Sequence, residues 1–446
     1  MNFTKSIPLV GIIVLLTCFL VFKSFFLYPN FSDETVYFNV AKNLKENLPY
    51  KDFFFAHPPL QIVLLSSILS FADSFFFVKM FMLIISGLVS LVIYFLAKDL
   101  NDKKVAFLST LLFIISPFFI VFSGQGYGMW ETLLFLLLSS LFALRGMIKT
   151  SALFLALGIF TRYLLILYLP LVLILMFYKK LDYRKFLVFL IIFTALFFIP
   201  TLIVFGYDFI NQTIGFQLFS QVVYNLPKHL DQFQSFGFFT FFLSLIAAFV
   251  GYWNKDKLLM TLAIYPALID ILLIASFKTL TYHYFSLSLP FIMIAASRAF
   301  FSSKESIAKV GIIVISLLAV YSNISTINFY FSPENSEAFD KIADYIGENS
   351  LETQKIFGEP VMTNYVSFVA DRKISGNYFD SYIRHLEYEG IDNVINKLER
   401  DKPHIIIDDG YLYSIGKFQD FINENYVLSK KFITSHAEYR IYIRKS

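Results

Sequence analysis

The stretch FLVFLIIFTALFFIPTLIVF, residues 186–205, contains twenty residues and no charge. A helix that crosses a lipid bilayer needs about 20 mostly apolar residues, so this stretch predicts a membrane-spanning helix. The whole chain agrees with that prediction: of its 446 residues 57% are hydrophobic, 19% aromatic and only 16% charged. A soluble domain carries about 25% charged residues. The composition excludes a cytosolic enzyme, a disordered chain, a collagen and a disulfide scaffold, the last because Cys18 is the single cysteine.

Similar apolar stretches recur along the first three quarters of the chain and predict about eleven transmembrane helices. The fifth and sixth are too short for two full spans, so they predict either two short helices meeting near Arg162 or one re-entrant hairpin. The eleven stretches cover residues 7–27, 75–97, 105–122, 128–145, 151–161, 163–178, 186–205, 236–252, 258–277, 284–300 and 307–327.

The distribution of lysine and arginine among the short loops predicts the orientation, because cytoplasmic loops are enriched in both residues. Alternate loops contain Lys98, Arg145, Lys179 and Lys255, whereas the opposite loops are poor in cations. We therefore expect a cytoplasmic N-terminus and an extracytoplasmic first loop. Eleven crossings then place the C-terminal region outside the membrane as well.

The charge density changes near residue 335. Residues 1–334 contain 23 basic and 15 acidic side chains, whereas residues 335–446 contain 14 and 18. This change predicts a membrane domain over residues 1–330, including a first outer loop at 29–74 with interfacial helices, followed by an extracytoplasmic α/β domain over 331–446. In the tail, hydrophobic periodicity predicts helices at 336–349 and 381–400 and strands at 355–358, 404–408, 426–432 and 439–444.

All three histidines of the membrane part, and acids such as Asp33 and Glu46, fall on the predicted outer side. There, Asp33 and Glu34 begin an amphipathic stretch. His57 precedes two prolines, which bar a helix through His57 and allow one to start at Pro59. Two adjacent acids are, in themselves, typical of a helix N-terminus, and isolated histidines are commonly structural. Asp270 alone lies deep in an apolar run, where it is either a relay residue or a hydrogen-bonded acid inside the bundle.

The order of motifs in the first loop resembles that of GT-C glycosyltransferases, in particular the protein O-mannosyltransferase and aminoarabinose-transferase branch, glycosyltransferase family 39. The match rests on Asp33-Glu34, the segment Pro49-Tyr50-Lys51-Asp52-Phe53, and His57-Pro58-Pro59-Leu60. Three further segments are similar to later motifs of that branch: Gly126–Glu131, Leu157–Tyr163 and Tyr282–Phe285. In the first of these segments, Glu131 stands where the branch more often has Asp.

The resemblance implies an enzyme that transfers a sugar from a polyprenyl-phosphate donor to a lipid, glycan or protein acceptor outside the membrane, with inversion. It implies Asp33, Glu34 and Glu131 as catalytic carboxylates, with Asp33 as general base. It implies that Arg162, Tyr163, His283 and Tyr284 bind the donor phosphate. A divalent metal is a candidate cofactor, with His57 as its candidate ligand, although no compact metal-binding motif is present.

The expected location is the plasma membrane of a prokaryote, and no nucleic acid is an expected partner. Two alternatives remain open on the sequence: a transporter or flippase of lipid-linked saccharide, and a GT-C-fold accessory subunit without catalysis.

Overall fold

The computed structural model describes residues 7–29, 32–219, 225–276, 281–434 and 437–445. The chain forms two compact units, each assembled from three separate segments. Unit 1 comprises residues 1–25, 81–198 and 222–330, and unit 2 comprises residues 26–80, 199–221 and 331–446. Unit 2 therefore combines the C-terminal tail with two earlier segments that sequence position alone assigns to the membrane domain.

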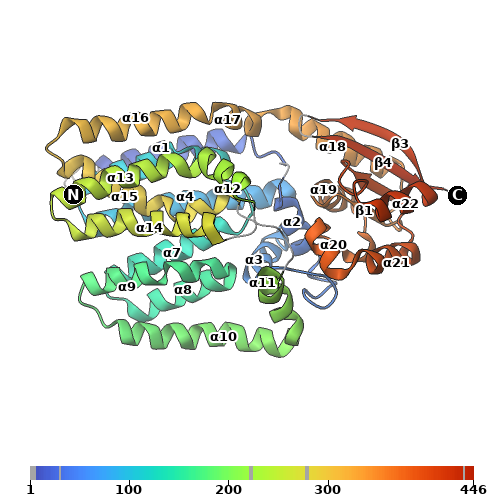
Figure 1. Ribbon diagram of the computed structural model, residues 1–446, viewed down its shortest axis with the longest axis horizontal. Coiled ribbons are helices and arrows are strands. Elements are labelled where there is room, and N and C mark those ends of the chain that lie inside the picture. Colours follow the sequence, from blue (N-terminus) through green and yellow to red (C-terminus); the bar gives the residue numbers. More distant parts are fainter. Residues whose placement is uncertain (1–6, 30–31, 220–224, 277–280, 435–436, 446) are drawn as a thin grey trace. The chain divides into compact units, whose positions relative to one another are not determined.

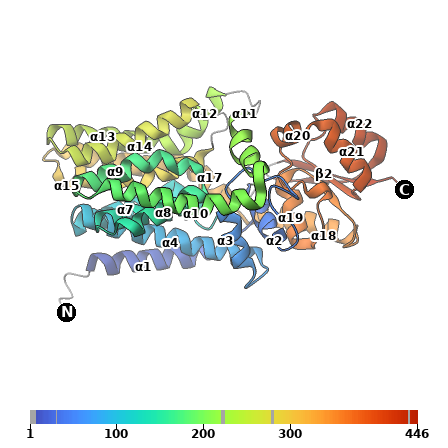
Figure 2. The ribbon, with the colours of Figure 1, turned by 90° about the horizontal axis from the view of Figure 1, so that it is seen from below.

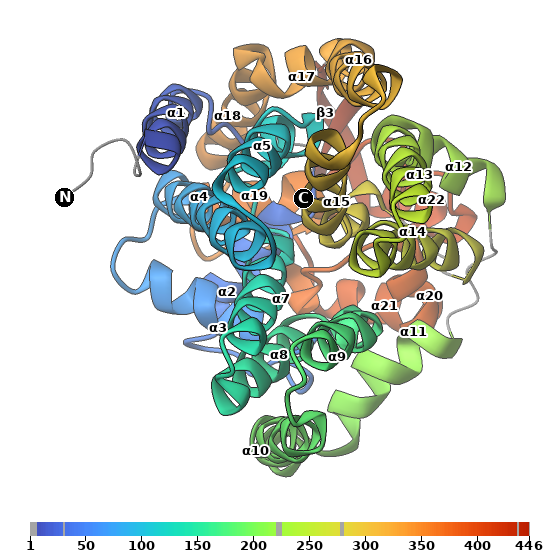
Figure 3. The ribbon, with the colours of Figure 1, turned by 90° about the vertical axis from the view of Figure 1, so that its left-hand side faces the viewer.

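Unit 1 is a bundle of apolar helices that lie roughly side by side (Figures 1 and 3). Its hydrophobic core is built mainly from α5, α7, α8, α9 and α13–α15, and includes the buried side chains Trp130, Leu136, Leu155 and Phe291. The helices of unit 1 are α1 (Ile7–Ser24), the later part of α4 (Phe75–Leu100), α5 (Lys103–Ile114), α6 (Pro117–Phe122), α7 (Met129–Leu144), α8 (Ile148–Thr161), α9 (Leu169–Tyr178), the first part of α10 (Tyr183–Ile210), α12 (Leu226–Gln232), α13 (Phe238–Trp253), α14 (Lys257–Ser276), α15 (Leu289–Ser302), α16 (Ser306–Ser322) and most of α17 (Ile324–Phe331).

All eleven predicted spans fall on helical structure, but several are interrupted. The predicted span 105–122 breaks at Ser116, whose hydroxyl accepts a hydrogen bond from the backbone N–H of Phe119 and so begins a second helix. The spans predicted to start at 163 and 284 lie on 3₁₀ segments, η2 (Tyr163–Tyr168) and η5 (Tyr282–Leu287), that lead into α9 and α15. The break at Arg162 matches the prediction that two short helices meet there.

Three helices in the described part of the chain are long and apolar enough to cross a membrane, namely Phe75–Leu100, Tyr183–Gly215 and Lys257–Ser276. The bent pair Ser306–Ser322 and Ile324–Glu348 makes a fourth if it is counted as one span. The longest of them bends at Gly206, whose φ of +61° is a backbone conformation that residues with a Cβ rarely adopt. Eleven crossings remain a prediction, because the other apolar helices are shorter.

Unit 2 contains a small four-stranded sheet with helices on both sides. The strand order is β1-β2-β4-β3, in which β1 (Ile356–Gly358) pairs parallel to β2 (Ile405–Asp408), and β4 (Glu438–Arg444) pairs antiparallel to both β2 and β3 (Tyr426–Ile433). The four strands match the predicted ones. In Figure 2 the sheet lies between α18 (Pro333–Glu348) and α19 (Pro360–Ala370) on one side and α21 (Ile391–Asp401) and α22 (Gly416–Asn425) on the other.

The helix predicted over 381–400 is two helices, α20 (Ile383–Glu389) and α21, because Gly390 between them has a φ of +88°. The structure also contains α19 and α22, which lie outside the predicted helices, and the short segments η3 (Asn211–Gly215), α11 (Phe216–Phe219) and η6 (Ser375–Asn377). The polytopic helical fold with a small α/β tail is nevertheless confirmed.

The first loop forms two helices, α2 (Glu34–Asn43) and α3 (Leu60–Leu69), and α2 packs against α19 of the tail. The hydroxyl of Thr35 donates to the carbonyl of Val361 at 2.9 Å, and the amide of Asn39 donates to that of Asn364 at 2.9 Å. Glu34 to Ala41 are all buried, so α2 is a core helix of unit 2. This packing brings the predicted carboxylate pair into contact with residues of the tail.

Candidate functional site

Asp33 and Glu34, which are adjacent in sequence, have different environments. Asp33 immediately precedes α2, and its side chain makes no capping bond to that helix. Its Oδ1 atom instead accepts a hydrogen bond of 2.5 Å from the hydroxyl of Tyr382. Asp33 is half-buried, whereas Glu34 is fully buried. Only the first of the two carboxylates is therefore partly accessible from outside unit 2.

Glu34 forms an ion pair with Lys79, which lies near the start of α4. The Lys79 Nζ–Glu34 Oε1 distance is 2.6 Å, and Lys79 is also buried, with its ammonium 5.8 Å from the ring centre of Phe75. Two buried charges that neutralise each other are a structural element, because either one alone would be costly in an apolar interior. Glu34, predicted as catalytic, thus has its charge balanced within unit 2.

A third carboxyl group, that of Glu359, lies near Asp33. It caps the start of α19 by accepting hydrogen bonds from the backbone N–H groups of Val361 and Met362 at 3.0 and 2.7 Å. Burial, reinforced by the negative charges of Asp409 and Asp33, raises the pKa of Glu359 to about 8. At neutral pH this carboxyl is therefore mostly protonated, which reduces its repulsion of the Asp33 carboxylate.

Arg162 and His283 lie together in unit 1. Arg162 follows α8 in an extended conformation, is 5% exposed, and donates a hydrogen bond to the backbone carbonyl of Tyr127. The ring of Tyr127 stacks on that of His283, with ring centres 5.1 Å apart. The charge of Arg162 acts on both His283 and Glu131. Glu131, Arg162 and His283, which were predicted from separate motifs, thus meet in one place together with Tyr127. We call these four residues the arginine cluster.

The arginine cluster is largely withdrawn from solvent. Burial and the neighbouring charge of Arg162 lower the pKa of His283 to about 3, so its imidazole is neutral at physiological pH. The ring nitrogen Nε2 of His283 lies 3.0 Å from the hydroxyl of Thr281. Glu131 is 2% exposed, and neither of its carboxylate oxygens has a hydrogen-bond partner among the described residues. A cationic group beside a neutral imidazole is suited to binding an anion.

The other two residues predicted to bind phosphate flank this cluster in the chain. Tyr163 begins η2 directly after Arg162, and Tyr284 follows His283 in η5, with a distance of 4.6 Å between the His283 and Tyr284 rings. Both tyrosines are half-buried and pack against the core of unit 1.

The segments that carry Arg162 and His283 resemble each other. Residues 161–170 read TRYLLILYLP and residues 281–290 read TYHYFSLSLP, with Thr, Leu, Leu and Pro at matching positions. Each forms a 3₁₀ helix followed by an α-helix that has proline in its first turn. Tyr168 and Ser288, at matching positions, share a hydrogen bond of 2.6 Å, and Ser288 also donates to Asp270 at 2.6 Å. Asp270 is therefore a buried, hydrogen-bonded acid, and its role as a relay residue stays a prediction.

No three His, Cys, Asp or Glu side chains of the described residues are grouped as metal ligands. His57, the candidate ligand, lies beside the rings of Tyr37 and Phe55, each with its centre 5.8 Å from that of the imidazole. Among the described residues, the side chains do not form the compact set of ligands that a divalent metal needs.

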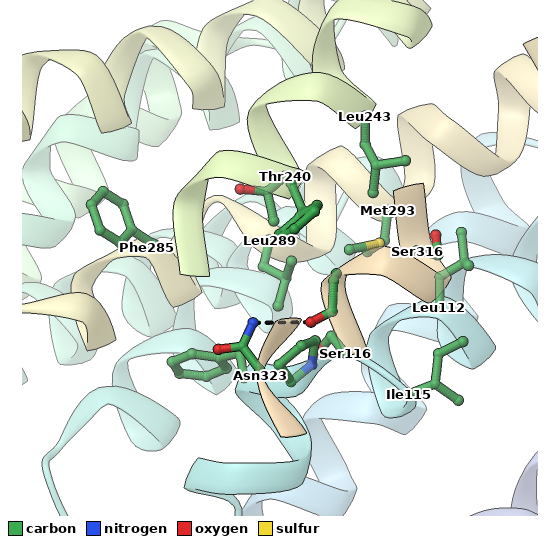
Figure 4. A pocket seen from close by; sticks show the side chains of 14 residues that line it. Leu112, Ile115, Ser116, Thr240, Leu243, Phe285, Leu289, Met293, Ser316 and Asn323 are labelled. Atoms are coloured by element: carbon green, nitrogen blue, oxygen red, sulfur yellow. Dashed lines mark hydrogen bonds between the residues drawn. The ribbon is translucent and has the colours of Figure 1, made fainter. Parts of the chain in front are cut away.

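A small cavity of about 30 Å³ lies within unit 1, among α5, α13, α15 and α16 (Figure 4). Its lining is mostly apolar and includes Leu112, Leu243 and Met293, with Asn323 held by a hydrogen bond of 2.9 Å to the carbonyl of Ala319. No titratable side chain lines it. The cavity therefore carries no chemistry of its own.

Sequence reasoning missed Tyr382, Glu359, Lys79 and the part played by Tyr127. Tyr382 and Glu359 lie in the tail, more than 300 residues from Asp33, so no local pattern relates them to it. For Lys79 there was a signal: a lysine inside an apolar span requires a buried partner, and Glu34 is an acid of the adjoining loop.

Comparison with solved structures shows the fold. The chain is similar over 98% of its length to ArnT from Cupriavidus metallidurans bound to undecaprenyl phosphate, with 98% of that chain covered, 10% sequence identity and a TM-score of 0.63. It is also similar to the oligosaccharyltransferase AglB from Archaeoglobus fulgidus in complex with an inhibitory peptide and a dolichol phosphate, covering 100% of this chain and 75% of that one at 13% identity and a TM-score of 0.53.

A structure of an oligosaccharyltransferase from Archaeoglobus fulgidus in complex with zinc and sulfate matches 97% of this chain, with 73% of that chain covered, at 14% identity and a TM-score of 0.53. No protein-family model and no curated protein matches the chain by sequence. The polypeptide thus has the fold of ArnT and of AglB, as the resemblance in the first loop led us to expect.

Proposed function

We propose that this protein is an integral membrane glycosyltransferase that transfers a sugar from a polyprenyl-phosphate donor to an acceptor hydroxyl on the extracytoplasmic face. The observation that carries the proposal is the difference between Asp33 and Glu34. Glu34 is fully buried and paired with Lys79, whereas the half-buried Asp33 carboxylate accepts a hydrogen bond from the hydroxyl of Tyr382. A partly accessible carboxylate is suited to accepting a proton.

In the proposed reaction, Asp33 removes the proton of the acceptor hydroxyl while its oxygen attacks the anomeric carbon of the sugar. The bond between that carbon and the phosphate oxygen breaks, and polyprenyl phosphate leaves with the bonding electrons. One displacement inverts the configuration at the anomeric carbon. General-base catalysis of this kind contributes about 10²- to 10⁴-fold to the rate.

The arginine cluster is proposed to bind the donor phosphate. The guanidinium of Arg162 matches a phosphate in charge and hydrogen-bond geometry, and its burial strengthens the attraction. Neutral His283 adds a ring N–H or an acceptor without adding charge. Tyr163 and Tyr284 supply hydroxyl groups from neighbouring positions. Two proteins of similar fold support this lipid chemistry, because ArnT was crystallised with undecaprenyl phosphate and AglB was solved with a dolichol phosphate.

The proposed location is a prokaryotic plasma membrane, with the N-terminus in the cytoplasm and the tail outside. The alternation of basic and cation-poor loops supports this orientation.

The test is a single-turnover assay of the purified protein with radiolabelled polyprenyl-phosphate sugars, with donor binding measured in parallel. Asp33→Asn keeps the shape of the side chain but cannot accept the proton, so transfer should fall by roughly 10² or more while donor binding persists. Asp52→Asn removes an exposed acid from the same loop and should have little effect. Full transfer by Asp33→Asn would refute the assignment of the base. Translocation of the labelled lipid without sugar transfer would identify a flippase.

A further inference from the structure

Tyr382 lies in the C-terminal tail and contacts Asp33 directly. Its hydroxyl lies 2.5 Å from Asp33 Oδ1, although 349 residues separate the two in sequence. Phenol and carboxylate at this distance form a strong hydrogen bond, because the acceptor is ionised.

The backbone around Tyr382 is anchored to the rest of the tail. On one side, the amide of Asn364 donates to the carbonyl of Phe379 at 2.6 Å, and the hydroxyl of Ser381 donates to the carbonyl of Gly358 at 2.6 Å. On the other, the carbonyl of Tyr382 accepts the backbone N–H of His385 at the start of α20. These contacts fix the phenol relative to the sheet and to α19, and α19 in turn packs on α2.

The charges near the phenol keep its proton in place. Burial and the carboxyl groups of Asp33, Glu359 and Asp380 raise the pKa of Tyr382 well above its usual value. Tyr382 is therefore a hydrogen-bond donor throughout the physiological pH range. The acids that act on it come from three segments: the start of α2, the start of α19 and the chain before α20.

We propose that Tyr382 is the positioning residue of the general base, and that the tail is thereby a working part of the enzyme. This inference rests on the proposed function. The Tyr382 hydroxyl holds one oxygen of the Asp33 carboxylate, so that the carboxylate keeps a single orientation toward the acceptor hydroxyl. A misplacement of about 1 Å in such a group costs roughly 100-fold in rate.

The test compares Tyr382→Phe with Tyr365→Phe. Tyr365 is a matched control because its hydroxyl donates to Asp340 Oδ1 at 2.6 Å, a bond of the same type in the same unit that does not involve Asp33. Tyr382→Phe should lower kcat by at least about tenfold with little change in the donor KM. The acid limb of its pH–rate profile should move to higher pH, because the carboxylate loses a hydrogen bond that favours its ionised form. Tyr365→Phe should change neither quantity.

A second variant distinguishes positioning from folding. Replacing Tyr382 with 4-aminophenylalanine keeps the ring and a donor at the same place, so it should restore most of the rate and the wild-type pH profile. If Tyr382→Phe transfers sugar as the wild type does, or if 4-aminophenylalanine is no better than phenylalanine, the inference is overturned while the proposed function stands. If the wild-type protein transfers no sugar from any polyprenyl-phosphate donor, the proposed function itself fails.

Discussion

The ammonium of Lys79 lies 2.6 Å from the carboxylate of Glu34, and both side chains are buried within unit 2. Lys79→Met should therefore destabilise the protein, because it leaves the Glu34 charge buried without its counter-ion. Breaking such a pair costs about 3–5 kcal/mol, which corresponds to a fall of roughly 10 °C in the thermal midpoint in detergent.

The matched control for this prediction is Lys373→Met. Lys373 pairs with Glu46 at 3.3 Å, but both side chains are about 70% exposed, so its loss should shift the midpoint little. The double variant Glu34→Gln with Lys79→Met should recover most of the loss, because it removes both charges. An unchanged midpoint in Lys79→Met alone would contradict the buried ion pair.

Arg162→Ala should weaken binding of the lipid donor by roughly 10- to 100-fold, since a phosphate would lose a buried, charged hydrogen-bond partner. His283→Ala should have a smaller effect, because the low pKa of His283, about 3, makes its imidazole a neutral partner. Equilibrium binding of a polyprenyl phosphate measures both. Arg145→Ala is the control: its guanidinium is partly exposed and pairs with Asp99 at 2.7 Å. If Arg162→Ala and the wild type bind the polyprenyl phosphate with equal affinity, Arg162 has a structural role and does not bind the phosphate.

Glu359 should make the stability depend on pH. Its pKa is about 8 in the folded protein, against about 4.5 in an unfolded chain. Between these values the folded state holds a proton that the unfolded state has lost, so the stabilisation is complete below pH 4.5 and disappears as the pH rises through 8. The expected slope is at most about 1.4 kcal/mol per pH unit.

Melting curves between pH 5 and 8.5 test this dependence. Glu359→Gln cannot ionise, so its midpoint should fall less with rising pH than that of the wild type. Glu352→Gln, which changes an exposed acid of the same unit, provides the comparison. Parallel curves for wild type and Glu359→Gln would show that Glu359 does not hold this proton.

The tail should lie outside the cell. Ser414 is exposed on the tail, and Cys18 is the single native cysteine. In a Cys18→Ser background, Ser414→Cys should react with an impermeant thiol reagent in intact cells, whereas Lys179→Cys, in a predicted cytoplasmic loop, should react only after lysis. The reverse pattern would invert the orientation and move the proposed reaction to the cytoplasmic face.

Hydrophobic pattern alone located the helices of the bundle, because long apolar stretches have few other stable structures in a membrane. It located the break near Arg162 but not the one at Ser116, where a few local hydrogen bonds decide between one helix and two. It also did not predict that the spans starting at 163 and 284 begin as 3₁₀ segments. The tail strands were predictable from alternation and β-branched residues, such as Ile405–Ile407. Helix α19 was not predicted, although its start has a recognisable sequence signal. Glu359 caps the helix, and Pro360 occupies its first position, where proline is common.

The site divides in the same way. Asp33, Glu131, Arg162 and His283 could be named as candidates because each belongs to a motif that is visible within ten residues. Asp33 and Glu34 have different environments because Asp33 contacts Tyr382 and Glu34 contacts Lys79. The order of residues in the sequence does not indicate which acid contacts which partner. The resemblance between segments 161–170 and 281–290 was present in the sequence, but a repeat of ten residues is shorter than the periods that mark repeat folds.

The assembly of unit 2 from the segments 26–80, 199–221 and 331–446 has a consequence during biosynthesis. The carboxylate of Asp33 leaves the ribosome 349 residues before the phenol that holds it. At about 5–20 residues per second, that interval is roughly 20–70 s. For most of that interval α2 lacks the tail helix that packs on it, and Asp33 lacks the hydroxyl of Tyr382. In the proposed mechanism, catalytic competence therefore arises only with the last part of the chain, so we predict that a nascent polypeptide that stalls before Tyr382 transfers no sugar.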